Sequence, residues 1–139
     1  MALTSCSKHN FVIFTDAFVA FQTDKSSSTI VDSEGTFTGT YYVHLTAPKP
    51  DEAIYVEFSV TPGSGLKEGV DYNVLTTGSL RFLPGIYDNQ VKIEWLSHPV
   101  DKSLDNTVTI RLDSCTNPNV TLGVIGPDEK NRSIVISKY

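Results

Sequence analysis

Tyrosines are the side chains of this sequence best suited to holding a ligand. An exposed tyrosine ring offers a flat apolar face on which a sugar ring can stack, and its hydroxyl adds a hydrogen bond. Tyr42 and Tyr55 are the best pair, because both are expected opposite the core face of neighbouring strands. The other aromatic candidates are Tyr41, Tyr72, Tyr87 and Trp95. Most aromatic rings in a β-sandwich form core or cross-strand pairs, so a glycan platform and plain packing both stay open.

Catalytic motifs are absent from the sequence. Neither G-x-S-x-G nor H-E-x-x-H occurs, and no glycine-rich loop has the spacing that cradles a phosphate. His9, His44 and His98 are far apart and lack metal-ligand spacing. Cys115 falls in the apolar alternation of a predicted strand, where a small buried side chain is the simplest interpretation. We therefore predict a protein that is not an enzyme.

Cys6 is the one residue that predicts a covalent modification. Leu3-Thr4-Ser5-Cys6 resembles a bacterial lipobox, in which an apolar residue and two small ones precede a cysteine that is lipidated. On this interpretation residues 1–10 form a tether, and the protein is extracytoplasmic, anchored by lipid to the outer membrane or cell surface. The alternative is an ordinary N-terminal tail that happens to contain a cysteine.

Composition and charge limit the classes of partner that the chain is expected to bind. The chain has 139 residues, 40% hydrophobic and 19% charged, which predicts a single globular domain over residues 11–139. Its net charge is −5, and its 11 Lys and Arg residues form no run. An acidic chain of this kind is not expected to bind nucleic acid. It is also not expected to dock electrostatically on an anionic membrane, so membrane contact is predicted only through a lipid on Cys6.

Short strands separated by turns fill the chain. In Thr36–Thr46, apolar residues alternate with threonines and other polar residues, which is the pattern of a half-buried strand. The remaining predicted strands are residues 17–21, 29–31, 53–61, 79–82, 91–96, 107–112, 120–125 and 134–136. The run Phe11-Val12-Ile13-Phe14 is either a first strand or a packed lead-in. This spacing predicts an all-β, immunoglobulin-like antiparallel β-sandwich of about seven to nine strands.

The most specific stretch runs from Glu68 to Trp95. Pro84-Gly85 fits the central pair of a type II turn, where proline presets φ and glycine accepts a positive φ. Asp71 is expected to accept backbone N–H bonds in a compact turn. Tyr72 is expected to bring an apolar ring with a polar tip to a sheet edge.

These motifs carry a family resemblance. From Glu34 to Ile136 the sequence resembles a Calx-beta domain. The matching segments are Ser33-Glu34-Gly35, Gly69-Val70-Asp71-Tyr72, residues 78–85, Val91-Lys92-Ile93, residues 107–112, Leu122-Gly123 and residues 133–136. The resemblance implies an immunoglobulin-like sandwich of a kind found in cell-surface proteins. Variant versions occur in surface lipoproteins of gut Bacteroidetes, which agrees with the interpretation of Cys6.

The resemblance also raises calcium binding. Calx-beta domains that bind Ca²⁺ gather acidic residues at one end of the sandwich, and Ca²⁺ requires six to eight oxygen ligands. The acidic residues that remain here as candidates are Asp32, Glu34, Asp101 and Asp105. Expected acids are replaced around Gly63 and at Ser97-His98, and the C-terminal acidic run is missing. We therefore predict no cofactor, with a calcium site as a weaker alternative to solvated loop carboxylates.

Two functions follow from the sequence. The first is a cell-surface interaction or structural module that binds a protein partner. The second is a glycan-binding accessory domain of a polysaccharide-uptake system, which would use Tyr42 and Tyr55. A calcium-regulated module is the third and weakest.

Overall fold

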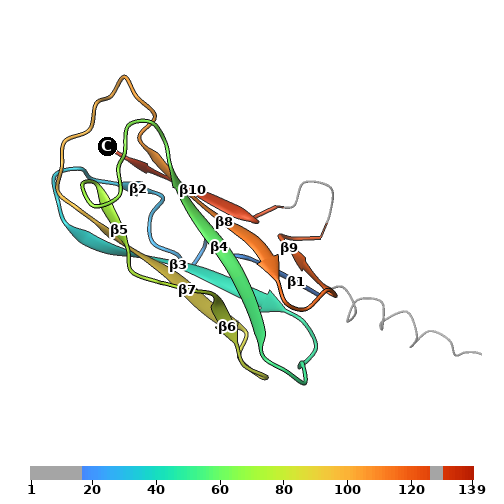
Figure 1. Cartoon of the computed structure of the whole chain (residues 1–139). Helices are drawn as coiled ribbons and strands as arrows, with labels where there is room; N and C mark the ends of the chain where they lie inside the picture. Colours follow the sequence, from blue (N-terminus) through green and yellow to red (C-terminus); the bar gives the residue numbers. More distant parts are fainter. Residues whose placement is uncertain (1–16, 126–129) are drawn as a thin grey trace, which may run out of the picture.

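The computed structural model describes residues 17–125 and 130–139, which form an all-β fold without helices. Two curled five-stranded sheets face one another as a β-sandwich (Figure 1). The predicted fold class is therefore confirmed. Within the described ranges, no helix is long and apolar enough to cross a membrane. The predicted lead-in Phe11–Phe14 lies outside them.

Each sheet mixes strands from early and late parts of the chain. The first sheet has the order β5-β7-β3-β1-β9, formed by β5 (Tyr72–Val74), β7 (Asp88–Trp95), β3 (Phe37–Thr46), β1 (Ala17–Phe21) and β9 (Val120–Leu122). The second has the order β2-β10-β8-β4-β6, formed by β2 (Ile30–Val31), β10 (Ser133–Lys138), β8 (Thr107–Cys115), β4 (Ile54–Pro62) and β6 (Leu80–Phe82). Consecutive strands β3 and β4 therefore belong to different sheets.

Three details differ from the sequence prediction. The described residues form ten strands rather than seven to nine, because short edge strands such as β5 carry little periodic signal. Two edge pairings, β1 with β9 and β2 with β10, are parallel, so the sandwich is not wholly antiparallel. Phe37 belongs to the apolar alternation of its strand, but it is the first residue of β3 and is 40% exposed.

The core forms from the inward residues of both sheets, as the alternation predicts. Tyr41 and Trp95 are fully buried, and the Trp95 indole donates a hydrogen bond of 3.0 Å to the Tyr41 hydroxyl. Tyr72 is 1% exposed at the sheet edge, and its ring centroid lies 6.0 Å from that of Trp95. The indole N–H of Trp95 is thus paired inside the core.

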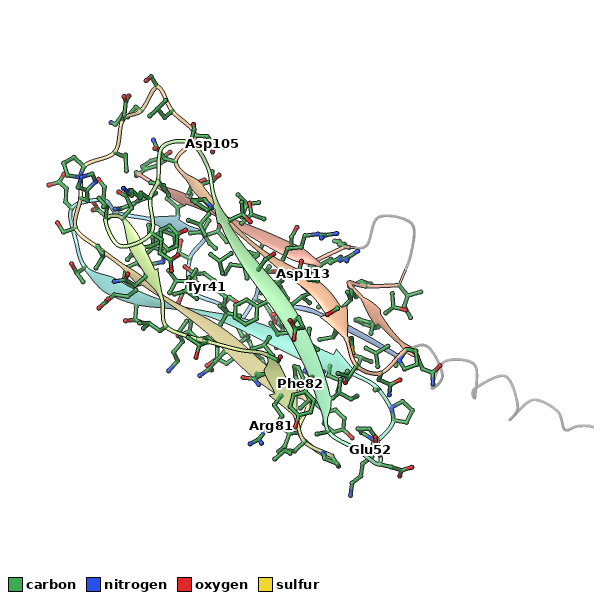
Figure 2. All side chains as sticks on the ribbon, in the orientation of Figure 1. Tyr41, Glu52, Arg81, Phe82, Asp105 and Asp113 are labelled. Carbon is green, nitrogen blue, oxygen red and sulfur yellow. The ribbon has the colours of Figure 1, made fainter. Side chains whose placement is uncertain are left out.

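The predicted turns hold the ends of the sandwich. Gly85 has a φ of 87°, and the Ile86 N–H donates to the Leu83 carbonyl at 2.8 Å, as a type II turn requires. Figure 2 shows Glu52 and Arg81 near this end and Asp105 at the opposite end. The two ends carry different chemistry.

Candidate functional site

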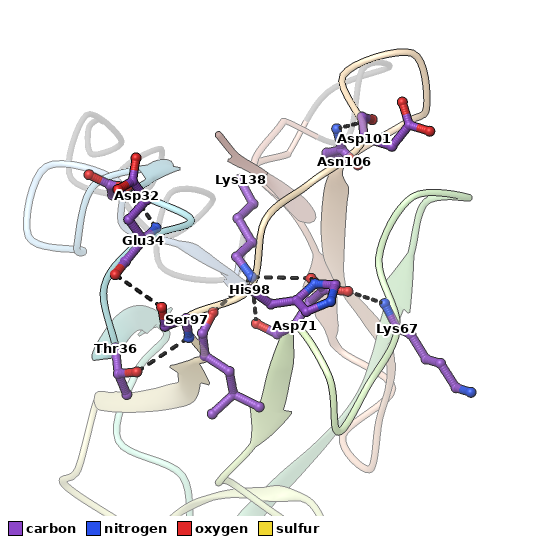
Figure 3. Close-up of polar contacts among 11 residues, drawn as sticks. Asp32, Glu34, Thr36, Lys67, Asp71, Ser97, His98, Asp101, Asn106 and Lys138 are labelled. Atoms are coloured by element: carbon purple, nitrogen blue, oxygen red, sulfur yellow. Dashed lines mark hydrogen bonds and ion pairs between the residues drawn. The ribbon is translucent and has the colours of Figure 1, made fainter.

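The predicted calcium ligands form two separate pairs. Asp32 and Glu34 share one turn, in which the Asp32 carboxylate accepts the Glu34 N–H at 2.8 Å. Asp101 and Asp105 lie in the loop between β7 and β8. Figure 3 shows Asp32 and Glu34 on one side and Asp101 on the other, with Lys138 between them. The structure does not bring the four carboxylates together.

Local hydrogen bonds also occupy the second pair. The Asp101 carboxylate accepts the Ser103 hydroxyl at 2.6 Å and the Ser103 N–H at 2.9 Å, and these bonds lower the pKa of Asp101. Asp105 accepts the Thr107 hydroxyl at 2.7 Å. Among residues 17–125 and 130–139, no group of three or more His, Cys, Asp or Glu side chains is placed to hold a metal ion. Calcium binding therefore stays a prediction, without a ligand cluster to support it.

A cluster of ionisable side chains stands at this end instead, formed by the buried Asp71 and Lys138 and the half-exposed His98, and we call it the charged clasp (Figure 3). The Lys138 ammonium donates to Asp71 Oδ1 at 3.2 Å, to the Asp71 carbonyl at 3.3 Å and to the Leu96 carbonyl at 2.8 Å. The His98 ring nitrogen Nδ1 lies 2.9 Å from Asp71 Oδ1. The Lys67 N–H donates to Asp71 Oδ2 at 2.9 Å, which confirms the expected turn role of Asp71.

The clasp links the two sheets. Lys138 ends β10 in the second sheet, whereas Asp71 precedes β5 in the first. The Lys138 side chain is fully buried, and the Asp71 side chain is 4% exposed. Burial alone would raise the pKa of Asp71, but hydrogen bonds from Lys67, His98 and Lys138 outweigh it, so the pKa is lowered. Asp71 therefore stays ionised in the folded protein at neutral pH.

Sequence reasoning missed the burial of Lys138, although a signal was present. Ile134 and Ile136 are inward residues of β10, and a period of two places Lys138 on the same face. A lysine at an inward position predicts a buried acceptor set. His98 was expected to be exposed in its loop, and its side chain is 48% exposed while one ring nitrogen contacts Asp71.

Tyr42 and Tyr55 do not form one platform. Tyr42 alternates with the buried Tyr41 and Val43 in β3, so it faces outward from the first sheet. Tyr55 lies in β4 of the second sheet, between two buried residues, and faces outward there. The prediction that they lie on neighbouring strands is wrong, because the chain crosses from one sheet to the other between β3 and β4.

Tyr55 lies instead at a groove at the opposite end of the sandwich from the charged clasp. Two loops, residues 47–53 and 116–119, form its walls, and its volume is about 1090 Å³. Two hydrogen bonds join these walls at Tyr55. The Tyr55 N–H donates to the Thr116 hydroxyl, and the Thr116 N–H donates to the Tyr55 carbonyl, both at 3.0 Å. The Tyr55 side chain is left exposed, at 41% for the whole residue. We call this the Tyr55 groove.

Three charged side chains at the Tyr55 groove are not used by the fold. Lys49, Asp51 and Glu52 are exposed, and within the described part of the chain their side chains have no hydrogen bond or ion pair. Pro48, Pro50 and Pro118 stiffen the same loops. A preformed hollow of this size, with an exposed aromatic ring and solvated charged groups, has the features of a binding site.

Comparison with known proteins does not assign the chain to a family. No protein-family model matches the sequence, and no curated protein matches it. The Calx-beta resemblance therefore stays a prediction, and the fold is established by the structure alone. Cys6, the predicted lipidation site, lies outside the described residues.

Proposed function

We propose that this chain is a non-enzymatic binding module outside the cytoplasm, and that a protein partner docks in the Tyr55 groove. The observation that carries the proposal is an exposed tyrosine at a preformed groove whose charged side chains, Lys49, Asp51 and Glu52, have no partner among residues 17–125 and 130–139. Tyrosines at the centre of an interface, surrounded by polar groups at its rim, supply most of the binding energy in protein complexes. The stiff proline-containing loops reduce the entropy lost on binding.

The position of the groove also fits a lipid anchor on Cys6. Ala17, the first described residue, lies in the groove wall. The chain from Cys6 to Ala17 spans at most about 40 Å when fully extended. A lipid on Cys6 would therefore keep the groove close to the membrane surface, and the partner would be a protein of the same surface.

Site-specific photo-crosslinking tests the protein partner. A photo-reactive amino acid replaces Glu52 in the groove or, as the control, Lys92, which is exposed on the outer face of the first sheet. We expect a discrete crosslinked protein only from position 52. The affinity of that purified protein should fall on Tyr55→Ala and not on Tyr42→Ala. Equal crosslinking from both positions would contradict the proposal.

Glycan binding is the second candidate, and one observation favours it. Tyr55, Asn117 and Asn119 lie around one hollow, and an aromatic face beside amide groups suits a sugar ring, with stacking on its C–H face and hydrogen bonds to its hydroxyls. A glycan array with the wild-type chain and Tyr55→Ala separates the candidates. A signal that disappears with Tyr55→Ala would favour glycan over protein, whereas an unchanged signal would place glycan binding elsewhere.

A further inference from the structure

The charged clasp combines an amine and a carboxyl group in a space that excludes water. The Lys138 side chain is 0% exposed and lies 3.2 Å from Asp71 Oδ1, whose side chain is 4% exposed. Burying such a pair removes the solvation of both charges, and their attraction offsets this only in part. A neutral covalent product would carry no such cost.

We propose that Lys138 and Asp71 condense into an intramolecular amide that joins the two sheets of the sandwich. The ion pair seen in the structure is the state before condensation. The net change is that an ammonium and a carboxylate give an amide and one water molecule, so the step needs no oxidant, reductant or other reactant. The product links β10 covalently to the turn before β5.

The two carboxylate oxygens are prepared for different roles. The Lys67 N–H, 2.9 Å from Asp71 Oδ2, lies where negative charge develops when an amine attacks the carboxyl carbon. The His98 Nδ1 atom, 2.9 Å from Oδ1, can carry a proton to the oxygen that leaves. Neither group has to move for the reaction to begin.

Proton transfers complete the step. A proton of Lys138 passes to Asp71 Oδ1 along their hydrogen bond, which gives a neutral amine and a neutral carboxylic acid. The nitrogen lone pair then forms a bond to the carboxyl carbon while the carbonyl electron pair moves to Oδ2. The Nδ1–H of His98 delivers its proton to Oδ1, and the ring then takes up the second proton of the lysine nitrogen. The carbon–Oδ1 bond breaks, water leaves, and the electron pair on Oδ2 restores the carbonyl.

The surroundings also suit the product. The amide keeps one N–H, and the Leu96 carbonyl, 2.8 Å from the lysine nitrogen, is placed to accept it. The half-exposed His98 ring offers the released water a route to solvent. Hydrogen bonds from Lys67 also stabilise the ionised Asp71, so we expect condensation to follow folding slowly rather than to accompany it.

Mass spectrometry of the purified full chain tests the proposal. We expect the intact mass to lie one water molecule below the sequence mass after prolonged incubation of the folded protein. Trypsin should then release residues 68–81 joined to residues 133–139, because the modified Lys138 resists cleavage. Lys138→Arg keeps the charge but cannot form the amide, so it should show its full mass. The control Lys102→Arg, at an exposed position, should still lose water.

The role of His98 has its own readout. His98→Ala should slow the appearance of the joined peptide at least tenfold while the fold, followed by circular dichroism, stays intact. A wild-type chain that keeps its full mass and gives the two peptides separately would overturn the proposal, and this result does not depend on whether any variant folds. Condensation at an unchanged rate in His98→Ala would overturn the assigned proton transfer.

Discussion

The two ends of the sandwich use polar residues in opposite ways. At the charged clasp, the Asp71 and Lys138 side chains are buried and fully engaged with one another and with backbone groups. At the Tyr55 groove, Lys49 and Glu52 are exposed and contribute nothing to the described fold. Charges that stabilise a fold must be paired when buried, whereas charges kept for a partner must stay unpaired and solvated. The clasp is therefore a structural site, and the groove is the better candidate for recognition.

Removing the buried amine should have the largest effect. Lys138→Met leaves Asp71 buried without its cation, so we expect the free energy of unfolding to fall by about 3–5 kcal/mol. Urea denaturation at neutral pH, on freshly folded protein that has not yet lost water, measures this loss. Lys49→Met, at the groove, should change stability by less than about 0.5 kcal/mol. Similar losses at both positions would erase the distinction between the two ends.

Close packing beside the clasp gives the next effect. A Cβ atom added at Gly65 would collide with the Asn106 side chain and lie 2.9 Å from Leu104 Cβ. Gly65→Ala should therefore destabilise the protein by about 1–3 kcal/mol. Gly35→Ala is the matched control, because nothing lies within 4 Å of its added Cβ. The difference between the two melting temperatures measures the effect, and equal values would contradict it.

Acid should remove the stability that the clasp contributes. The pKa of Asp71 is lowered in the folded protein from its ordinary value of 3.8. The unfolded chain then binds more protons at low pH, so the stabilisation is present above about pH 4 and is lost as the pH falls further. Urea midpoints measured from pH 7 to pH 2.5 should decline more steeply for the wild-type chain than for Asp71→Asn. Parallel curves would show that Asp71 does not drive the decline.

The Tyr55 groove should show the reverse pattern, with binding affected and stability unchanged. Tyr55→Ala should change the free energy of unfolding by less than about 0.5 kcal/mol. The same change should weaken the affinity for the crosslinked partner about tenfold, which corresponds to about 1.4 kcal/mol of binding free energy. Scanning calorimetry of the wild-type and Tyr55→Ala chains measures the stability, and titration calorimetry measures the affinity. Tyr42→Ala is the control in both. A large loss of stability would instead make Tyr55 a structural residue.

Calcium should have the smallest effect. The candidate carboxylates are divided into two pairs, and the ammonium of Lys138 lies between them. Millimolar Ca²⁺ should therefore shift the melting temperature by less than about 1 °C, because a ligand stabilises only a fold that binds it. Magnesium serves as the ionic-strength control. A rise in melting temperature with calcium but not with magnesium would show that a metal site exists after all.

Much of the fold was predictable from local patterns. The strand ends at Ala17 and Phe21 agree with the prediction, and β6 begins one residue after the predicted Ser79 and ends at the predicted Phe82. The alternation of Thr36–Thr46 identified Tyr41 as a core residue, because its spacing matches the period of a strand. Boundaries were less accurate where strands extend into half-exposed ends, as in β8, which runs on to Cys115.

The candidate sites were less predictable, since each depends on segments that are distant in sequence. Nothing local shows that Asp71 meets a lysine near the C-terminus, or that residues 47–53 and 116–119 enclose one groove. The Tyr42 and Tyr55 pairing failed for the same reason. A period of two indicates which side of a strand is inward, but not which sheet the strand joins.

By itself, the sequence determined the class of fold, the central turns and the acidic character of the chain, since strand period, glycine conformation and charge are local properties. Only the tertiary structure decided which polar residues are used up and which are free. Lys138 is confined by packing between two sheets, whereas Lys49 stays in solvent. The physical reason is that pairing depends on distance in space and on the exclusion of water, and both are set by how the sheets meet.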